Sequence, residues 1–191
     1  MLIEQKNANY RAIIGKLSTA MHPLGTGDLA ELRRMAPDGP GCAAFWRLAA
    51  ECGFIEEANK TDTWMRIVKI MAILTPKGER TTASPVHDPK QRLGAVLCDG
   101  GDPAWNAAAH PLLSEARLMR LLAEPQRRGE TLERVARMLA AKRKSGDGFD
   151  CNTIAALLLV PNSKTIPREI ARAYYRRLDH AAHEAKQKED A

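Results

Sequence analysis

Residues 114–144 read SEARLMRLLAEPQRRGETLERVARMLAAKRK, and this stretch decides the fold class. Apolar residues recur in it at three- and four-residue intervals on both sides of Pro125, at Leu118, Leu121, Leu122, Leu132, Val135, Ala136 and Leu139. The spacing predicts two amphipathic helices joined at the proline. Arginines and lysines lie off both apolar faces, so the two helices must pack on other helices and leave their cationic sides in water.

The same spacing recurs along the rest of the chain. It predicts helices over residues 5–20, 28–35, 42–52, 63–75, 89–98, 151–160 and 165–180, with a further turn over 103–109. Side chains are expected to cap four of these helices: Asp28 in a capping box with Glu31, Asp62 or Thr61, Asp88 before Pro89, and Asp150. No segment alternates apolar and polar residues as a β-strand does.

We therefore expect an all-α protein of about nine helices, arranged as two small helical bundles. Residues 99–112 are small, flexible and interrupted by prolines, which is typical of a connection between bundles. This connection places an N-terminal helical bundle over residues 1–105 and a C-terminal helical bundle over residues 106–191.

Charge and composition favour an anionic partner in the cytoplasm. The 191 residues carry a net charge of +6, and nucleic acid is the commonest partner of a basic soluble protein. Four scattered cysteines without a CxxC pair suit a reducing compartment. The N-terminus lacks the apolar core of a signal peptide, and no apolar run approaches the roughly 20 residues that span a bilayer. We therefore expect cytoplasmic localisation and no membrane.

The motifs of catalysis are missing from the sequence. It contains no GxxxxGK[ST] or GxGxxG phosphate loop, no GxSxG elbow and no zinc-ligand spacing. His180 and His183 could present two imidazoles on one side, but no HExxH-type carboxylate set accompanies them. Acidic residues stand one helical turn before basic ones, as Glu133 does before Arg137, which favours supporting ion pairs over general acid–base chemistry. We expect no enzyme, no cofactor and no metal.

The aromatic residues Trp46, Trp64, Tyr174 and Tyr175 fall on the expected helices among apolar neighbours. Packing in a core or an interface is therefore favoured over base stacking for them. Tyr175 is the exception, because it borders a row of basic residues at one-turn intervals: Arg168, Arg172 and Arg176.

Five motifs then follow one another along the chain: GDLAELRR at 27–34, FWRL at 45–48, RLG at 92–94, SEARLMRLL at 114–122 and IARAYYR at 170–176. In this order they resemble the CasB family, the small subunit of the type I-E CRISPR surveillance complex Cascade. The resemblance covers residues 25–178. Ile170 stands where the family often has tryptophan, and the segment 151–160 lacks the family's acidic and aromatic residues.

The resemblance implies an all-helical, two-bundle subunit without enzymatic activity. Its partners would be the other Cascade subunits and a second copy of itself, placed head to tail. A basic surface would bind the guide RNA and target DNA, including the displaced strand, without sequence preference. By motif, the phosphate-binding candidates are Arg34, Arg117 and Arg120. Charge and predicted exposure add Lys60, Arg127, Arg128, Lys142 and Arg143, and for each of the eight a solvated face is the alternative.

Three other readings remain open. Residues 149–177 fit a helix-turn-helix of a DNA-binding transcription regulator, although Pro167 would occupy the helix start that normally reaches base edges. The interpretation as a nuclease is weakened because the sequence shows no carboxylate or histidine cluster. A helical adaptor would use its basic faces only on acidic proteins.

Overall fold

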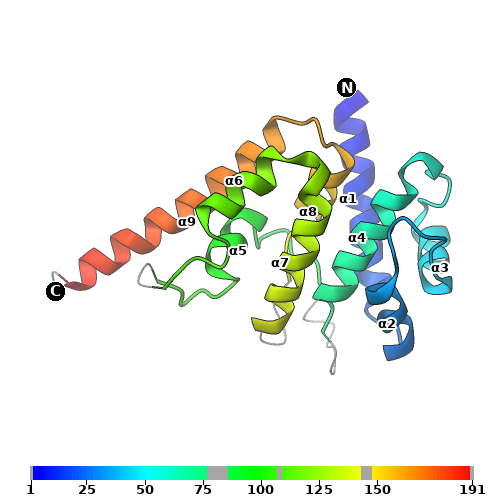
Figure 1. Ribbon diagram of the computed structural model, residues 1–191, viewed down its shortest axis with the longest axis horizontal. Coiled ribbons are helices and arrows are strands. Elements are labelled where there is room, and N and C mark those ends of the chain that lie inside the picture. The colour runs from blue at the N-terminus through cyan, green and yellow to red at the C-terminus, as the bar shows by residue number, and fades with distance from the viewer. Residues whose placement is uncertain (1, 77–85, 107–108, 143–147, 190–191) are drawn as a thin grey trace.

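The computed structural model describes residues 2–76, 86–106, 109–142 and 148–189, with the backbone alone at 2–8, 142 and 184–189. These residues form nine α-helices, two short 3₁₀ helices and no strand, which confirms the all-α class (Figure 1). The elements are α1 (Leu2–Met21), α2 (Thr26–Arg34), α3 (Ala43–Cys52), η1 (Ala58–Lys60), α4 (Thr61–Leu74), α5 (Leu93–Asp99), α6 (Glu115–Ala123), η2 (Pro125–Arg127), α7 (Arg128–Lys142), α8 (Cys151–Leu159) and α9 (Thr165–Glu189).

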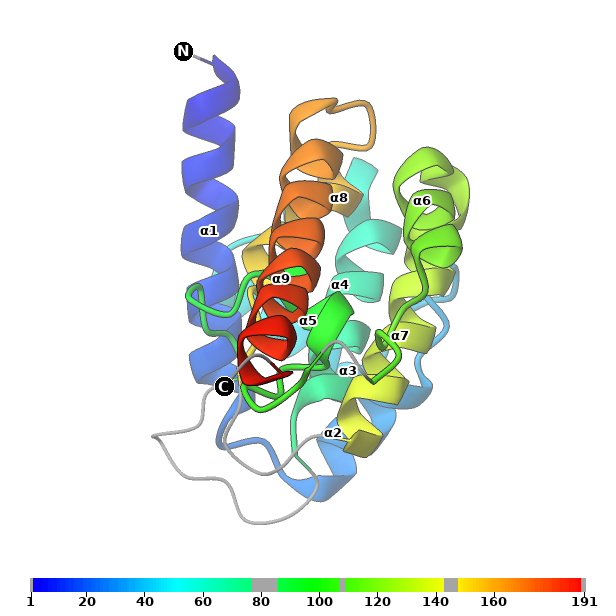
Figure 2. The same ribbon diagram turned by 90° about the vertical axis from the view of Figure 1, so that its left-hand side faces the viewer.

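Helix α4 is the central helix, because its side chains are buried almost all round. Helices α1, α2, α7 and α8 pack on it. Figure 2 shows α1 on one side of the molecule and α6 and α7 on the opposite side, with α4, α8 and α9 between them. The long helix α9 projects beyond the other helices at its C-terminal end (Figure 1).

The core runs across the boundary that we predicted near residue 105. One cluster of buried apolar side chains extends from Tyr10 on α1 to Tyr174 on α9. Helix α5, which lies before the boundary, packs mainly on α9, and α4 packs on α7. The predicted division into two bundles therefore does not correspond to a gap in the core.

Three of the four predicted caps are wrong. Helix α4 begins at Thr61 and has no side-chain cap, and tertiary contacts explain the other two. Helix α2 begins at Thr26, so Asp28 lies in its first turn and binds Arg47 at 2.7 Å. Helix α5 begins at Leu93, because the chain before it hydrogen-bonds to the segment before α8. The predicted cap of α8 is confirmed: Asp150 accepts hydrogen bonds from the amides of Asn152 and Thr153. The described part of 103–109 forms no helix.

Arginines close the C-terminal ends of two helices. The last carbonyls of a helix lack partners within it and carry partial negative charge. Arg33 donates to the carbonyls of Ala72 and Thr75, both at 2.9 Å, where α4 ends. At the end of α5, Arg177 instead binds the side-chain carboxylate of Asp99 at 2.6 Å and donates to the Trp105 carbonyl beyond the helix at 3.0 Å. These arginines serve the fold, so they do not belong to a cationic surface.

The cysteines and the apolar length of the helices were also considered in the sequence. The four cysteines are thiols, and three of them are buried. Over the described ranges, no helix is long and apolar enough to cross a membrane.

Candidate nucleic-acid interface

The first candidate surface runs along α6 and the following η2, where Arg117, Arg120 and Arg127 are all exposed. Arg120 and Arg127 reach the same carboxylate, Glu124, at 3.9 and 3.6 Å. Their side chains are 68% and 72% exposed, and ion pairs this open contribute little. Arg117 makes no ion pair with any described residue. We call these three residues the α6–η2 arginine set.

Arg128 is not exposed, so that part of our prediction is wrong. Only 3% of the residue is accessible, and its guanidinium donates to four backbone carbonyls. The two short bonds, both 2.7 Å, reach Leu122 near the end of α6 and Pro161 just after α8. Burial lowers the pKa of Arg128 from its usual value. Arg128 therefore joins two helix ends and cannot reach a phosphate.

The other predicted residues lie apart from this surface. Arg34 is exposed at the end of α2. Lys60 is half-buried: it binds Glu57 at 3.3 Å, hydrogen-bonds to the Tyr10 hydroxyl and sits over that ring. These contacts occupy Lys60 within the fold. Lys142 is the last residue of α7, but its side chain lies outside the described residues, as does the whole of Arg143.

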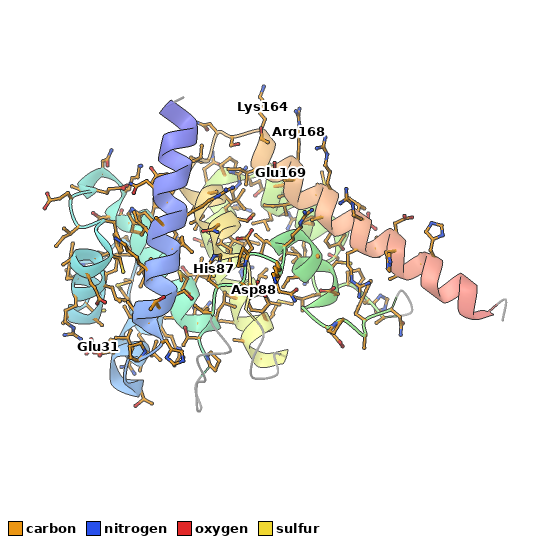
Figure 3. All side chains as sticks on the ribbon, turned by 180° about the vertical axis from the view of Figure 1, so that it is seen from behind. Glu31, His87, Asp88, Lys164, Arg168 and Glu169 are labelled. Atoms are coloured by element: carbon orange, nitrogen blue, oxygen red, sulfur yellow. The ribbon has the colours of Figure 1, made fainter. Side chains whose placement is uncertain are left out.

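A second candidate surface is a cleft of about 430 Å³ between α1, the start of α5, the start of α8 and α9. Figure 3, drawn from behind, labels one of its lining residues, Glu169, near the start of α9. Four arginines line it: Arg11, Arg92, Arg172 and Arg176. We call this feature the arginine cleft.

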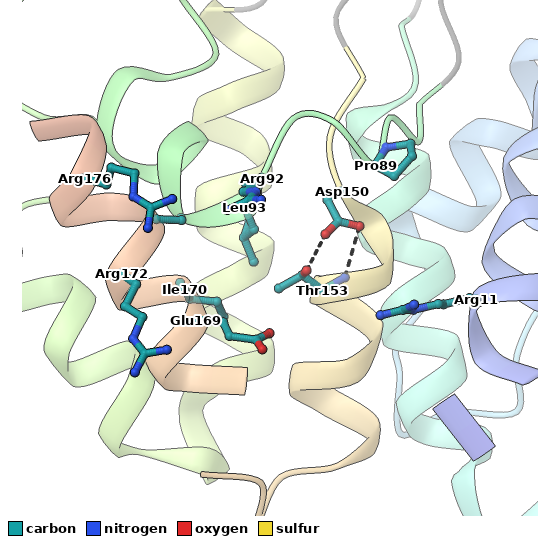
Figure 4. A pocket seen from close by; sticks show the side chains of 12 residues that line it. Arg11, Pro89, Arg92, Leu93, Asp150, Thr153, Glu169, Ile170, Arg172 and Arg176 are labelled. Atoms are coloured by element: carbon teal, nitrogen blue, oxygen red, sulfur yellow. Dashed lines mark hydrogen bonds between the residues drawn. The ribbon is translucent and has the colours of Figure 1, made fainter. Parts of the chain in front are cut away.

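All four arginines of the cleft are exposed, and none forms an ion pair with a described residue. Two carboxylates share the lining with them (Figure 4). Asp150 is already occupied as the cap of α8, where it accepts from the Asn152 and Thr153 amides at 3.1 and 3.4 Å. Glu169 makes no hydrogen bond or ion pair with any described residue. The cleft therefore carries an excess of positive charge.

The sequence indicated two of the four arginines that line this cleft. Arg172 and Arg176 belong to the row that we noticed at one-turn spacing, and the structure confirms that the row is exposed. Arg92 was part of a motif but not a site candidate, and Arg11 was missed. Their convergence depends on how α5 packs against α9 and α1 against α8, for which the sequence contains no local signal.

The aromatic residues follow the helical pattern only in part, because Trp46 is 39% exposed, with its indole N–H donating to the Pro40 carbonyl at 3.0 Å. Trp64 and Tyr174 are fully buried, and the Tyr174 hydroxyl donates to the Leu113 carbonyl at 2.7 Å. Burial raises the pKa of Tyr174 to about 12. Tyr175 is 39% exposed and donates to Glu115 at 2.9 Å, so it borders the arginine row with one edge open to solvent.

Both surfaces offer planar guanidinium groups, which suit phosphate oxygens. Where side chains are described, no group of three or more His, Cys, Asp or Glu residues could hold a metal ion. Comparison with protein-family models, with curated proteins and with solved structures found no match to this chain.

Proposed function

We propose that this chain is a non-catalytic small subunit of a type I-E CRISPR Cascade complex that binds nucleic acid through phosphate contacts. The order of the five motifs supports this assignment, and the all-α fold agrees with what the resemblance implies. The other Cascade subunits and a second copy of the chain would be its protein partners.

The observation that carries the proposal is the charge of the α6–η2 arginine set. Two of its three exposed guanidinium groups, those of Arg120 and Arg127, share one carboxylate, Glu124, through ion pairs that are open to water, and Arg117 has no ion pair with a described residue. A phosphate can replace such weak pairs at little cost, because water already screens them. Binding would also release counterions condensed on the nucleic acid.

Contacts of this kind position a protein on a strand without reading its sequence. In RNA-guided recognition, base pairing with the guide supplies the sequence, and protein contacts bias a nearly balanced exchange of strands. A few arginines that hold the displaced strand or the guide–target duplex are sufficient for this role. Weak binding by the isolated chain is expected, since assembly would add avidity.

The proposal is tested by the double variant Arg117→Glu/Arg120→Glu. Reversal of two exposed charges should weaken binding to unrelated single- and double-stranded DNA by tenfold or more at about 50 mM salt. Fluorescence anisotropy across a salt series measures the loss, and circular dichroism should show unchanged helicity and melting temperature. Lys16→Glu/Lys164→Glu is the matched control, because it changes the net charge equally at exposed positions outside both arginine surfaces.

Three results would contradict the proposal. Equal losses in the two double variants would show that net charge alone governs binding. A dissociation constant of the wild type that does not change with salt would exclude phosphate contacts. A strong preference for one duplex sequence would favour the transcription regulator.

A further inference from the structure

We propose that the arginine cleft is a second, separate site, which binds the phosphate of one nucleotide unit. The choice of a nucleotide rests on the proposed function, whereas the anion preference rests on the cleft alone. The ligand would be either a phosphodiester of a single strand or a free nucleotide, since both present the same phosphate chemistry.

The first argument is that the cleft arginines lack the partners that other arginines of this chain have. Arg33 and Arg128 bind helix-end carbonyls, and Arg177 binds Asp99. In contrast, Arg11, Arg92, Arg172 and Arg176 converge from three elements on one cavity without an ion pair to a described residue. Like charges brought together repel one another, and a bound anion would relieve that repulsion.

The second argument is the size and lining of the cleft. Its volume of about 430 Å³ lies in the range of small-ligand sites. The side chains of Leu93 and Ile170 give it an apolar part, and the arginines lie along its rim (Figure 4). One nucleotide unit matches this combination, because it joins an anionic phosphate to a less polar sugar and base.

The third argument is that the cleft stands on a fixed framework. Gly94 lets α5 approach α9 so closely that an added Cβ would lie 2.1 Å from the Ile170 carbonyl oxygen. The start of α8 is held by His87, whose Nδ1 accepts from the Cys151 amide at 3.2 Å. The backbone that carries Arg92, Arg172 and Arg176 is therefore held in place, so a ligand has to order only their side chains.

Glu169 determines where the phosphate lies. It is the cleft carboxylate without a described hydrogen-bond partner, so its charge repels an anion from its end of the cavity. The phosphate is therefore expected between Arg92 and the two arginines of α9, Arg172 and Arg176, rather than at Glu169 (Figure 4). The apolar part beside Leu93 and Ile170 is left for the rest of the nucleotide.

The test compares the full-length chain with Arg92→Ala/Arg172→Ala. Binding of a fluorescent 12-nucleotide single strand should weaken about tenfold, and the slope of log K against log salt should become shallower by about 1. Arg134→Ala/Arg168→Ala removes the same charge from exposed positions outside the cleft and should change the affinity less than threefold. Glu169→Gln should tighten binding a few-fold, since it removes repulsion without adding charge.

Adenosine 5′-monophosphate and inorganic phosphate distinguish the two sources of the phosphate. If the cleft holds a strand, millimolar monophosphate should compete poorly with the 12-nucleotide strand. If it holds a free nucleotide, the monophosphate should raise the melting temperature of the wild type but not of Arg92→Ala/Arg172→Ala. Either result supports a phosphate site. The proposal would be overturned if Arg92→Ala/Arg172→Ala kept the strand affinity of the wild type and neither anion changed the melting temperature of the wild type.

The two sites can fail separately. If Arg92→Ala/Arg172→Ala binds the strand as the wild type does while Arg117→Glu/Arg120→Glu does not, the cleft is not a site and the proposed function stands. If the cleft variant alone loses binding, the cleft is a site and the α6–η2 arginine set is not. Circular dichroism on each variant identifies a loss of fold.

Discussion

At the scale of single residues, adjacent arginines have opposite roles. Arg127 ends η2 with a side chain that is 72% exposed, whereas Arg128 begins α7 and is buried. No described carboxylate neutralises Arg128. Instead, its guanidinium lies among the carbonyls at the ends of α6 and α8, whose partial negative charge offsets the cost of burying a cation.

We expect Arg128→Ala to destabilise the protein by about 3 kcal/mol, because it leaves four carbonyls near two helix ends without their donor. Arg128→Lys should recover only part of this loss, since an ammonium cannot reproduce the planar arrangement of donors. Urea denaturation measures both changes. Arg127→Ala is the matched control and should change the free energy of unfolding by less than about 0.5 kcal/mol.

At the scale of elements, the contact between α5 and α9 depends on one glycine. A Cβ at Gly94 would meet the Ile170 carbonyl oxygen at 2.1 Å and the Tyr174 amide nitrogen at 2.9 Å. Both atoms belong to the backbone, so the helices would have to separate to admit a methyl group. The same contact holds Arg92, just before α5, beside the arginines of α9.

Gly94→Ala should therefore destabilise the protein by about 2 to 4 kcal/mol, as overpacking against a backbone does. It should also weaken any phosphate binding in the arginine cleft, because the two walls move apart. Gly15→Ala, in the middle of α1, meets nothing within 4 Å and should stabilise the protein by about 0.5 to 1 kcal/mol. If Gly15→Ala lowered the free energy of unfolding as much as Gly94→Ala does, the close approach of α5 and α9 would not explain the effect.

At the scale of the whole molecule, one core joins the segments on both sides of residue 105. Two of its thiols lie far apart in sequence, Cys52 at the end of α3 and Cys98 in α5. Burial, together with the negative charge of Glu51 and Asp99 respectively, raises both pKa values from 9.0 to about 11. Each thiol therefore stays protonated in the folded protein at a pH where the unfolded chain has lost the proton.

This difference makes stability fall at alkaline pH. Between pH 9 and 11 the unfolded state binds fewer protons than the folded state, so unfolding becomes more favourable as the pH rises. The loss should reach about 2 kcal/mol for each thiol. Urea denaturation under reducing conditions at pH 7, 9 and 10.5 measures it, and Cys98→Ala should make the dependence shallower. A single transition at each pH is expected of one core, and two transitions would favour independent bundles.

The sequence by itself determined the helices, because the information for them is local. Apolar residues three and four positions apart define a face, and that periodicity located α4, α6 and α9 as well as the burial of Tyr174. The cap of α8 at Asp150 was equally local. The caps predicted at Asp28 and Asp88 were wrong because both residues have partners distant in sequence. Asp28 binds Arg47, and the backbone of Asp88 hydrogen-bonds to the segment before α8.

The tertiary structure alone decided what each cation does. Arg127 and Arg128 are neighbours with the same chemistry, and only the position of α8 buries one of them. Arg11, Arg92 and Arg172 are separated by about 80 residues at each step, and only the packing of α5 on α9 and of α1 on α8 brings them to one cavity. The physical reason is that helical periodicity fixes the side of a helix on which a charge lies, whereas long-range packing fixes what that side meets.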